Sequence, residues 1–172
     1  MSLHRIGYPC VSSLINRTTN HETILRTATP EKLRGLIAQN LADLHTILEH
    51  NLAHGWLLFR IGSSVVPFGS HPINTIQWWH EFKDEIRSVG KFARTNDMRL
   101  SFHPGQYTVL NSPDAAIVTR AIDELTYSAR FLDELGMDTT CKIVIYLGGV
   151  YGDKPAAMER FCETVKLLPP AL

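Results

Sequence analysis

Short hydrophobic runs alternate along this chain with longer stretches in which hydrophobic residues recur every three or four positions. The short runs are residues 5–9 (RIGYP), 56–62 (WLLFRIG), 99–102 (RLSF) and 142–149 (KIVIYLGG). Runs of this length bounded by glycine, proline and polar residues are typical of buried strands, whereas the longer spacing is typical of amphipathic helices. The pattern therefore predicts a strand followed by a helix, repeated four times.

The first long stretch carries signals for both ends of a helix. Thr29 precedes Pro30 and Glu31, an order in which the threonine caps the helix and the proline takes its first position. One hydrophobic stripe follows, made of Leu33, Ile37, Leu41, Leu44 and Leu48. Because Gly55 is a stop signal, we expect a helix between Thr29 and Gly55, after a long polar loop.

Three further helices are predicted. The hydrophobic face of the second is formed by Ile76, Trp79, Phe82, Ile86 and Val89. The third is capped by Ser112 and Pro113 and ends at Gly136. Its inner face is formed by Ile117, Ala121, Leu125 and Leu132. The fourth is expected over residues 154–168, after the last strand.

Alternating strands and helices predict an α/β fold with a parallel sheet and right-handed connections. Two architectures fit: an open doubly wound sheet, or half of a (β/α)₈ barrel, whose complete form needs about 250 residues. The 172 residues suit one domain, and no repeat or change of composition marks a boundary within residues 1–172. Neither GxGxxG nor GxxxxGK[ST] occurs, which disfavours a nucleotide-binding loop.

Composition restricts the classes of partner. Seventeen basic and seventeen acidic residues give a net charge of zero, so contact with nucleic acid requires a local basic patch. Three cysteines without a CxxC pair indicate a reducing compartment, and we expect an intracellular protein, in the cytoplasm or nucleoid if the source is bacterial. No hydrophobic run approaches the roughly 18 residues of a membrane span, so we expect no membrane partner.

The candidate chemistry lies at the carboxyl ends of the predicted strands. His71 and His103 each precede a proline after neighbouring strands, so they would share one edge of a parallel sheet and could share a metal. Each could instead satisfy a backbone group, and two neutral imidazoles lack the carboxylates that phosphodiester hydrolysis uses. Tyr107, after the Pro-Gly turn, could stack on a base or pack on its own loop. Arg60 could meet a phosphate or a structural carboxylate.

Several longer motifs are similar to those of a known family. RIGYPC, NLADLHTILEHNLAHG, FRIGSSVVPFGSHP, RLSFHPGQYTVLNSPD and LGGVYGDK together resemble the UV-damage endonucleases (UVDE or UvsE), in order and over nearly the whole chain. The resemblance implies a TIM barrel related to endonuclease IV, with a divalent-metal site for which manganese is the expected ion. It also implies hydrolysis of the backbone of double-stranded DNA on the 5′ side of ultraviolet photoproducts.

The resemblance implies roles for individual residues. His71 and His103 match family metal ligands, and the motifs assign no other catalytic residue. Gln106 and Tyr107 match a pair that fills the gap when damaged nucleotides are flipped out of the duplex. Tyr8 matches an aromatic residue near the damage pocket.

Two features depart from the family pattern. Tyr146 stands where the family reads IVIHLGG, and a phenol with a pKa of about 10 is a poor substitute for a ligand histidine. The later strands of the family, which supply carboxylates, have no counterpart before Leu172. We therefore expect the N-terminal half of a UV-damage endonuclease: about four βα units of a barrel, an incomplete metal site and little incision alone. Its open side should expose an apolar inner face and a strand edge, through which two copies could associate.

Two alternatives remain open. The chain could be a non-catalytic remnant that binds damaged DNA through Tyr8, Gln106 and Tyr107 but has lost metal chemistry at Tyr146. It could also be a metal-dependent barrel of the sugar-isomerase type, which uses histidines and carboxylates at strand ends but gives the Gln-Tyr pair no role. Selective binding of irradiated DNA in the presence of a chelator would favour the first, and turnover of a sugar the second.

Overall fold

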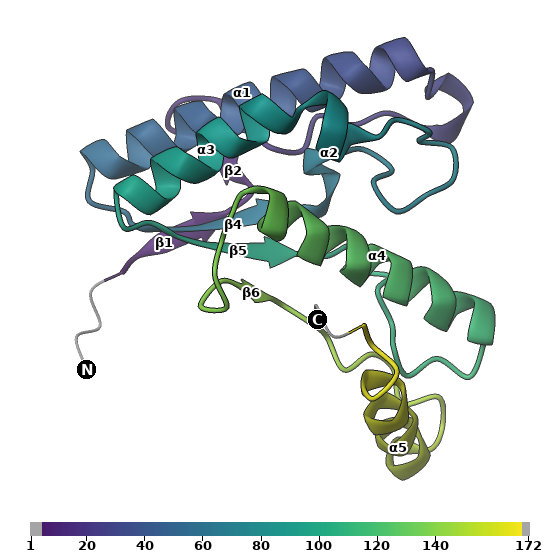
Figure 1. Ribbon diagram of the computed structural model, residues 1–172. Helices are drawn as coiled ribbons and strands as arrows, with labels where there is room; N and C mark the ends of the chain where they lie inside the picture. The colour runs from purple at the N-terminus through teal and green to yellow at the C-terminus, as the bar shows by residue number, and fades with distance from the viewer. Residues whose placement is uncertain (1–4, 170–172) are drawn as a thin grey trace.

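The structure is a computed structural model and describes residues 5–169 (Figure 1). Its elements are β1 (Gly7–Pro9), β2 (Val11–Ser12), β3 (Arg17–Thr18), the 3₁₀ helix η1 (Leu25–Thr27), α1 (Pro30–Ala53), β4 (Leu58–Gly62), the 3₁₀ helix η2 (Ser63–Val65), α2 (Trp78–Glu81), α3 (Lys83–Thr95), β5 (Arg99–His103), α4 (Ala115–Glu134), β6 (Lys142–Ile143) and α5 (Lys154–Val165). Strands β1, β4, β5 and β6 form one parallel sheet in that spatial order, and β2 and β3 form a small antiparallel pair. Each strand of the parallel sheet comes from one of the four predicted hydrophobic runs.

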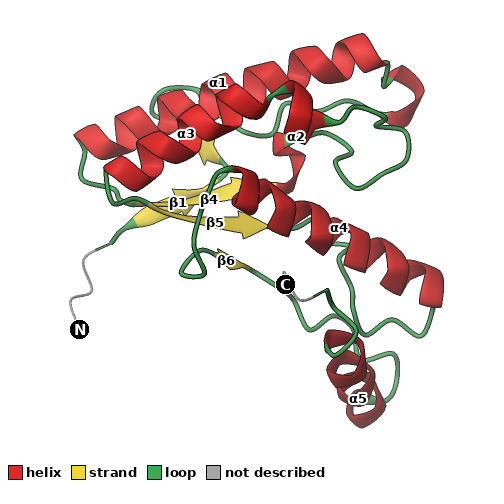
Figure 2. Ribbon diagram, viewed as in Figure 1, coloured by secondary structure: helices red, strands yellow, loops and turns green. Residues whose placement is uncertain are grey.

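The long helices that connect these strands lie on the same face of the sheet. Figures 1 and 2 show α1, α3 and α4 on one side of β1, β4 and β5, and none of the described helices covers the opposite side. A doubly wound sheet carries helices on both faces, whereas a (β/α)₈ barrel carries them only on its outside. The predicted α/β fold is confirmed, and of the two architectures the structure has the partial barrel.

The hydrophobic core lies between the sheet and this helix layer. Phe59 and Ile61 of β4 and Leu100 and Phe102 of β5 are fully buried, because alternate residues of a strand point to the same face. Full burial of a side chain of this kind contributes about 1.5–3 kcal/mol. The stripe predicted on α1 is confirmed, since all five of its members are buried: Leu33, Ile37, Leu41, Leu44 and Leu48.

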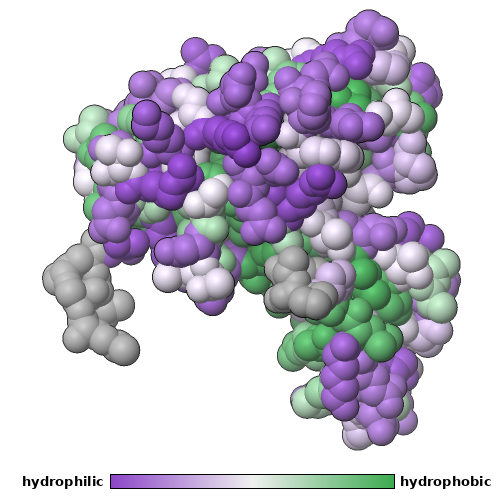
Figure 3. Space-filling view, viewed as in Figure 1, coloured by the Kyte–Doolittle hydropathy of each residue, from purple (hydrophilic) through white to green (hydrophobic). Residues whose placement is uncertain are grey.

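The opposite face of the sheet is polar. Arg60 of β4 and Ser101 and His103 of β5 alternate with the core residues and are only partly buried; we call this side the polar face. The prediction of an apolar inner face is therefore wrong for the C-terminal halves of these two strands, whereas Leu58 at the start of β4 is an apolar residue on this side. Hydrophobic exposure is found instead after β6, at Ile145 and Leu147, and Figure 3 shows hydrophobic surface there, beside α5.

Helix ends follow most of the predicted signals. Thr29 caps α1 by accepting a hydrogen bond at 3.3 Å from the backbone N–H three residues later, and Gly55 follows the helix with a φ of +72°. The cap of α4 is Asp114, which accepts from an N–H two residues later at 2.8 Å, while Ser112 accepts from the N–H of Asp114. The predicted cap at Ser112 and Pro113 is wrong because a carboxylate one position further on satisfies the free N–H groups.

No helix within residues 5–169 combines the length and hydrophobicity needed to cross a membrane.

Three elements are shorter than predicted. The second helix is divided into α2 and α3 because Phe82 leaves helical geometry, with φ −110° and ψ 25°. The fourth strand, expected over residues 142–149, is regular only in β6, since β6 pairs with β5 on one side and Gly148 adopts a φ of +87°. Helix α5 ends at Val165, three residues earlier than expected.

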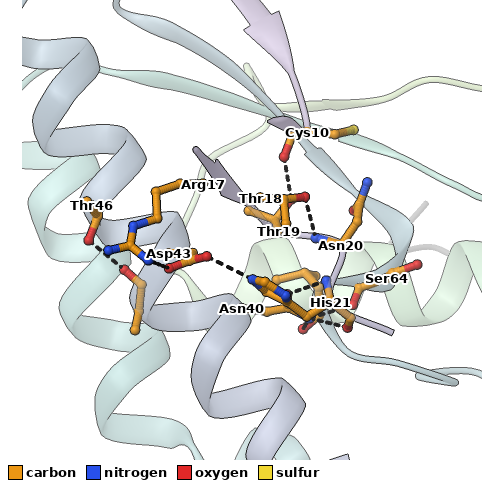
Figure 4. Close-up of polar contacts among 12 residues, drawn as sticks. Cys10, Arg17, Thr18, Thr19, Asn20, His21, Asn40, Asp43, Thr46 and Ser64 are labelled. Atoms are coloured by element: carbon orange, nitrogen blue, oxygen red, sulfur yellow. Dashed lines mark hydrogen bonds and ion pairs between the residues drawn. The ribbon is translucent and has the colours of Figure 1, made fainter. Parts of the chain in front are cut away.

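The polar stretch before α1, predicted to be a long loop, contains β2 and β3 and is fastened to α1 (Figure 4). Asn40 is fully buried; it accepts from the N–H of His21 at 2.8 Å and donates to the carbonyl oxygens of His21 and Ser64 at 3.0 and 2.9 Å. Asp43 lies 2.9 Å from the imidazole of His21 and 3.4 Å from the guanidinium of Arg17. One side of α1 thereby holds this segment beside the C-terminal end of β4.

The contact between α3 and α4 depends on Gly90. A Cβ at this position would lie 1.8 Å from the backbone oxygen of Leu135, the residue that ends α4. We expect Gly90→Ala to lower the free energy of unfolding by about 1–3 kcal/mol, because the two helices must separate. Urea titration measures this change. Gly35→Ala on α1 is the control: nothing lies within 4 Å of its Cβ position, and we expect a gain of about 0.5–1 kcal/mol. Similar stabilities for the two variants would contradict the steric argument.

Candidate functional site

The C-terminal ends of β4 and β5 bring two loops to one edge of the sheet. In the parallel register, Gly62 at the end of β4 lies opposite His103 at the end of β5. Residues 63–77, the β4 loop, carry His71, and the chain after β5 carries Gln106 and Tyr107, which we call the loop tip. Neighbouring parallel strands therefore deliver both groups of predicted residues to the same end of the sheet.

A hollow of about 410 Å³ lies between these two loops. Its lining includes His71 from the β4 loop, Gly105 and Tyr107 from the chain after β5, and Glu124 from α4. The structure therefore brings His71 and the loop tip together around one concave surface.

The loop tip projects into solvent from a buried base. Tyr107 is 82% exposed and Gln106 is also exposed, whereas Pro104 and Thr108 on either side are buried. The N–H of Thr108 donates to the carbonyl oxygen of Gly105 at 3.0 Å, which closes the turn. An aromatic ring held in this way has free faces on which a base can stack. Of the two roles considered for Tyr107, packing on its own loop is not what the structure shows.

His103 lies on the polar face and contacts Tyr146 directly. The imidazole Nε2 and the phenol oxygen are 2.7 Å apart, in a hydrogen bond. Partial burial, followed by the positive charge of Arg60, lowers the pKa of His103, so the neutral imidazole predominates at pH 7. The hydroxyl of Tyr146 thus takes up one of the two ring nitrogens of His103 through which an imidazole can bind a metal.

His71 is engaged in a turn of its own. Its Nδ1 accepts the N–H of Ile73 at 3.1 Å, which leaves Nε2 free. The hollow that His71 lines does not include His103. Among residues 5–169, no three histidine, cysteine, aspartate or glutamate side chains are grouped so as to hold a metal ion. Two separate imidazoles and a phenol therefore do not fit a divalent cation by themselves.

Arg60 provides positive charge on the polar face. It lies opposite Ser101 in the sheet and close enough to His103 to lower the pKa of that imidazole. The ion pairs formed within residues 5–169 do not include Arg60. Of the two partners considered for this guanidinium, the described chain supplies no carboxylate, which leaves it available to an anion.

Tyr8 lies on the other face of the sheet. Its ring packs edge-on against Trp56 and Phe59, with centroid distances of 5.9 and 5.5 Å, and its hydroxyl donates to Asn51 of α1 at 2.7 Å. These contacts hold β1 against α1. The structure does not bring Tyr8 together with the loop tip, and its implied role near a lesion stays a prediction.

Two polar residues at this site gave no signal in the sequence. The hydroxyl of Ser70 in the β4 loop donates to Glu124 of α4 at 2.7 Å. In the sequence, Glu124 occupies an ordinary polar position of an amphipathic helix, and Ser70 is one of several loop serines. Their pairing becomes visible only when α4 is placed behind both loops.

Known proteins resemble this chain over most of its length. The family model described as UV-endonuclease UvdE matches residues 1–172. A UV DNA damage endonuclease of Clostridium perfringens is 43% identical over 164 residues, which are 95% of this chain and 40% of that protein. One of Bacillus cereus is 36% identical over 151 residues, 88% of this chain and 48% of that protein.

The fold of this chain also resembles a solved structure. The crystal structure of SacUVDE matches with a TM-score of 0.92 and 34% identity, covering 97% of this chain and 57% of that one. The chain spans about half the length of the curated relatives that it matches. The similarity therefore extends over the whole described fold but over only part of each relative.

Proposed function

This chain belongs to the UV-endonuclease UvdE family, and from that premise we propose that it serves DNA repair by recognising ultraviolet photoproducts in double-stranded DNA. The reaction proposed for the whole protein is hydrolysis of the DNA backbone on the 5′ side of the lesion, with a divalent metal, manganese, as cofactor. Free cysteines at positions 10, 141 and 162 are consistent with the intracellular location that a DNA substrate requires.

The observation that carries the proposal is the exposed loop tip directly after β5. A nucleotide that leaves the duplex opens a gap in the stack, and an aromatic ring entering the gap recovers about 1–3 kcal/mol of stacking per base. Tyr107 has the exposure and the buried base that this role needs. Because a photoproduct is poorly stacked, it costs less to extrude than an intact pair, so the loop tip would select lesions without reading sequence.

Arg60 supports contact with the DNA backbone. A chain with no net charge needs local cations to bind DNA, and guanidinium groups form paired hydrogen bonds with phosphate oxygens. We propose that Arg60 contacts a phosphate close to the lesion, because it lies on the polar face next to His103 without an ion-pair partner in the described chain.

Binding of the 172-residue chain to a duplex before and after ultraviolet irradiation tests the proposal. We expect the irradiated duplex to bind at least about fivefold more tightly, the lower end of one stacking contact. A chelator should leave this preference in place, because the loop tip and Arg60 hold no metal. Fluorescence anisotropy at constant salt measures both affinities. Equal affinity for the two duplexes would overturn the proposal.

We further propose that His71 and His103 supply ligands to a metal site that needs groups beyond the described residues. His103 ends β5 and His71 lies in the loop that follows the neighbouring parallel strand β4, so both belong to the end of the sheet from which barrels of this type present functional side chains. The described residues contribute imidazoles but no clustered carboxylate.

Tyr146→His is expected to bind Mn²⁺ about tenfold more tightly than the unchanged chain, because it replaces the phenol beside His103 with an imidazole. Calorimetric titration with Mn²⁺ measures the change. Tyr146→Phe removes the hydroxyl without adding a ligand, and its affinity should stay weak.

Neither the chain nor Tyr146→His is expected to cut irradiated DNA in the presence of manganese, because hydrolysis of phosphodiesters also needs carboxylates. Efficient nicking beside the lesions by either protein would show that the described residues suffice.

A non-catalytic protein that binds damaged DNA is the second candidate. The hydrogen bond between Tyr146 and His103 favours it, because a phenol, which is a poor metal ligand, engages one of the two ring nitrogens of His103. The two candidates differ when the C-terminal half of a relative is supplied in trans: restored incision supports the endonuclease. No observation favours the sugar-isomerase alternative.

We also propose that two copies of the chain associate through the unpaired edge of β6 and the exposed Ile145 and Leu147. Analytical ultracentrifugation tests this proposal.

A further inference from the structure

We propose that Glu124 of α4 is a positioning residue that fixes the loop tip relative to the β4 loop. The inference rests on the proposed function, since it concerns the part of the molecule that would meet damaged DNA. Glu124 itself is half-buried at the wall of the hollow and has no role in the chemistry of the family motifs.

One carboxylate reaches both loops. Oε2 of Glu124 accepts the hydroxyl of Ser70 at 2.7 Å, and Oε1 accepts the N–H of Gly105 at 3.4 Å. Within residues 5–169, no other hydrogen bond connects residues 104–107 to a separate element of the fold. Besides the burial of Pro104 and Thr108, this side chain is therefore the one hydrogen-bonding connection that orients the exposed turn within the described residues.

Helix α4 holds the β4 loop at a second point one turn further on. The hydroxyl of Tyr127 donates to the carbonyl oxygen of Ser63 at 3.0 Å and accepts the N–H of Val66 at 3.1 Å. The Tyr127 ring also closes over Gly69, where a Cβ would lie 2.4 Å from it. Tyr127 thus anchors the β4 loop independently of Glu124, and what Glu124 adds is the connection to the loop tip.

A carboxylate suits this connection because each of its oxygens can accept from one loop, and hydrogen bonds to an ionised acceptor are stronger than neutral ones. A glutamine has one acceptor oxygen and can satisfy one of the two donors well. Holding the loop tip in place before DNA arrives reduces the ordering cost of binding. Loss of the connection should therefore weaken binding of the lesion, where the loop tip enters the duplex, more than binding of intact DNA.

Three variants test this. Glu124→Ala removes both acceptor oxygens, and Glu124→Gln retains one of them. Asp123→Asn is the control, because it makes the same change of charge as Glu124→Gln at the neighbouring exposed residue. The side chain of Asp123 forms no hydrogen bond in the described chain. We expect the ratio of affinities for irradiated and intact duplex to fall about tenfold in Glu124→Ala and about threefold in Glu124→Gln. It should not change in Asp123→Asn. Affinity for intact duplex should stay within about twofold in all three, which a general loss of structure would not allow.

Hydrogen exchange at the amide of Gly105 tests the connection without DNA. We expect exchange at least about tenfold faster in Glu124→Ala than in the unchanged chain, with the helical amides unaffected. Unchanged exchange at Gly105 would overturn the inference, as would an unchanged affinity ratio. If the unchanged chain shows no preference for irradiated DNA, the proposed function fails and the Gly105 amide still decides this inference. If Glu124→Ala does not fold, Ser70→Ala replaces it, because it releases one end of the connection. We expect Ser70→Ala to lower the ratio of affinities for irradiated and intact duplex about threefold. An unchanged ratio would count against the proposal.

Discussion

Replacement of Tyr107 by alanine is expected to remove most of the chain's preference for irradiated over intact duplex. The ratio of the two affinities should fall by about 5- to 150-fold, the equivalent of the ~1–3 kcal/mol that an aromatic ring contributes by stacking on a base. Because Tyr107 is 82% exposed, loss of its side chain should change the free energy of unfolding by no more than about 0.5 kcal/mol. Fluorescence anisotropy with both duplexes and a urea titration measure the two effects.

Two further variants show whether stacking is the cause. Tyr107→Trp retains a large flat ring and should retain the preference. Tyr151→Ala removes a half-exposed tyrosine from the loop after β6, which is not part of the loop tip, and should leave the ratio unchanged. An irradiated duplex bound as tightly by Tyr107→Ala as by the unchanged chain would rule out the proposed role of the loop tip.

Asn40→Leu is expected to have the largest effect on stability, lowering the free energy of unfolding by about 3 kcal/mol or more. The variant leaves the N–H and carbonyl of His21 and the carbonyl of Ser64 partly buried without their partner, at about 1–3 kcal/mol for each group that water does not reach. The loop that precedes α1 and the start of the β4 loop should both loosen, since Asn40 joins them (Figure 4). Urea titration followed by circular dichroism measures the loss.

The neighbouring Gln39 offers a matched control. It lies on the exposed side of α1, and Gln39→Leu also replaces an amide with the same hydrophobic side chain. Its effect should stay within about 0.5 kcal/mol. A cost below about 1 kcal/mol for Asn40→Leu would show that water replaces the lost partner at little expense.

Much of the fold could be predicted because its signals are local. The hydrophobic stripe of α1, its cap at Thr29 and its stop at Gly55 depend on residues a few positions apart, and all three are confirmed. The extent of the fourth strand could not be predicted in this way. Lys142 and Ile143 pair with β5, and the N–H of Val144 still donates to the carbonyl oxygen of Phe102 at 3.0 Å. In the described structure residues 145–149 pair with no strand, and strand structure depends on such partners.

In the candidate site, too, what could be predicted depends on whether the signal lies in neighbouring residues or in distant contacts. The sequence left two roles open for Tyr107, stacking on a base or packing on its own loop, and its exposure in the structure is what excludes the second. Tyr8 is a second case: a tyrosine at a strand end can point to either face, and only its contacts with Phe59 and Asn51 show that it joins the core. No feature of the local sequence marks Glu124, which acts on residues about twenty and fifty positions away.

The sequence by itself determined the family and the order of strands and helices along the chain, because these follow from motifs and from periodicities of two and 3.6 residues. Tertiary structure alone decided that the helices cover one face of the sheet, that the other face is polar and that Tyr146 bonds to His103. It also decided that Glu124 joins two loops. The physical reason is that these contacts join side chains distant in the chain, and their partners are chosen by packing of the whole sheet and its helices rather than by neighbouring residues.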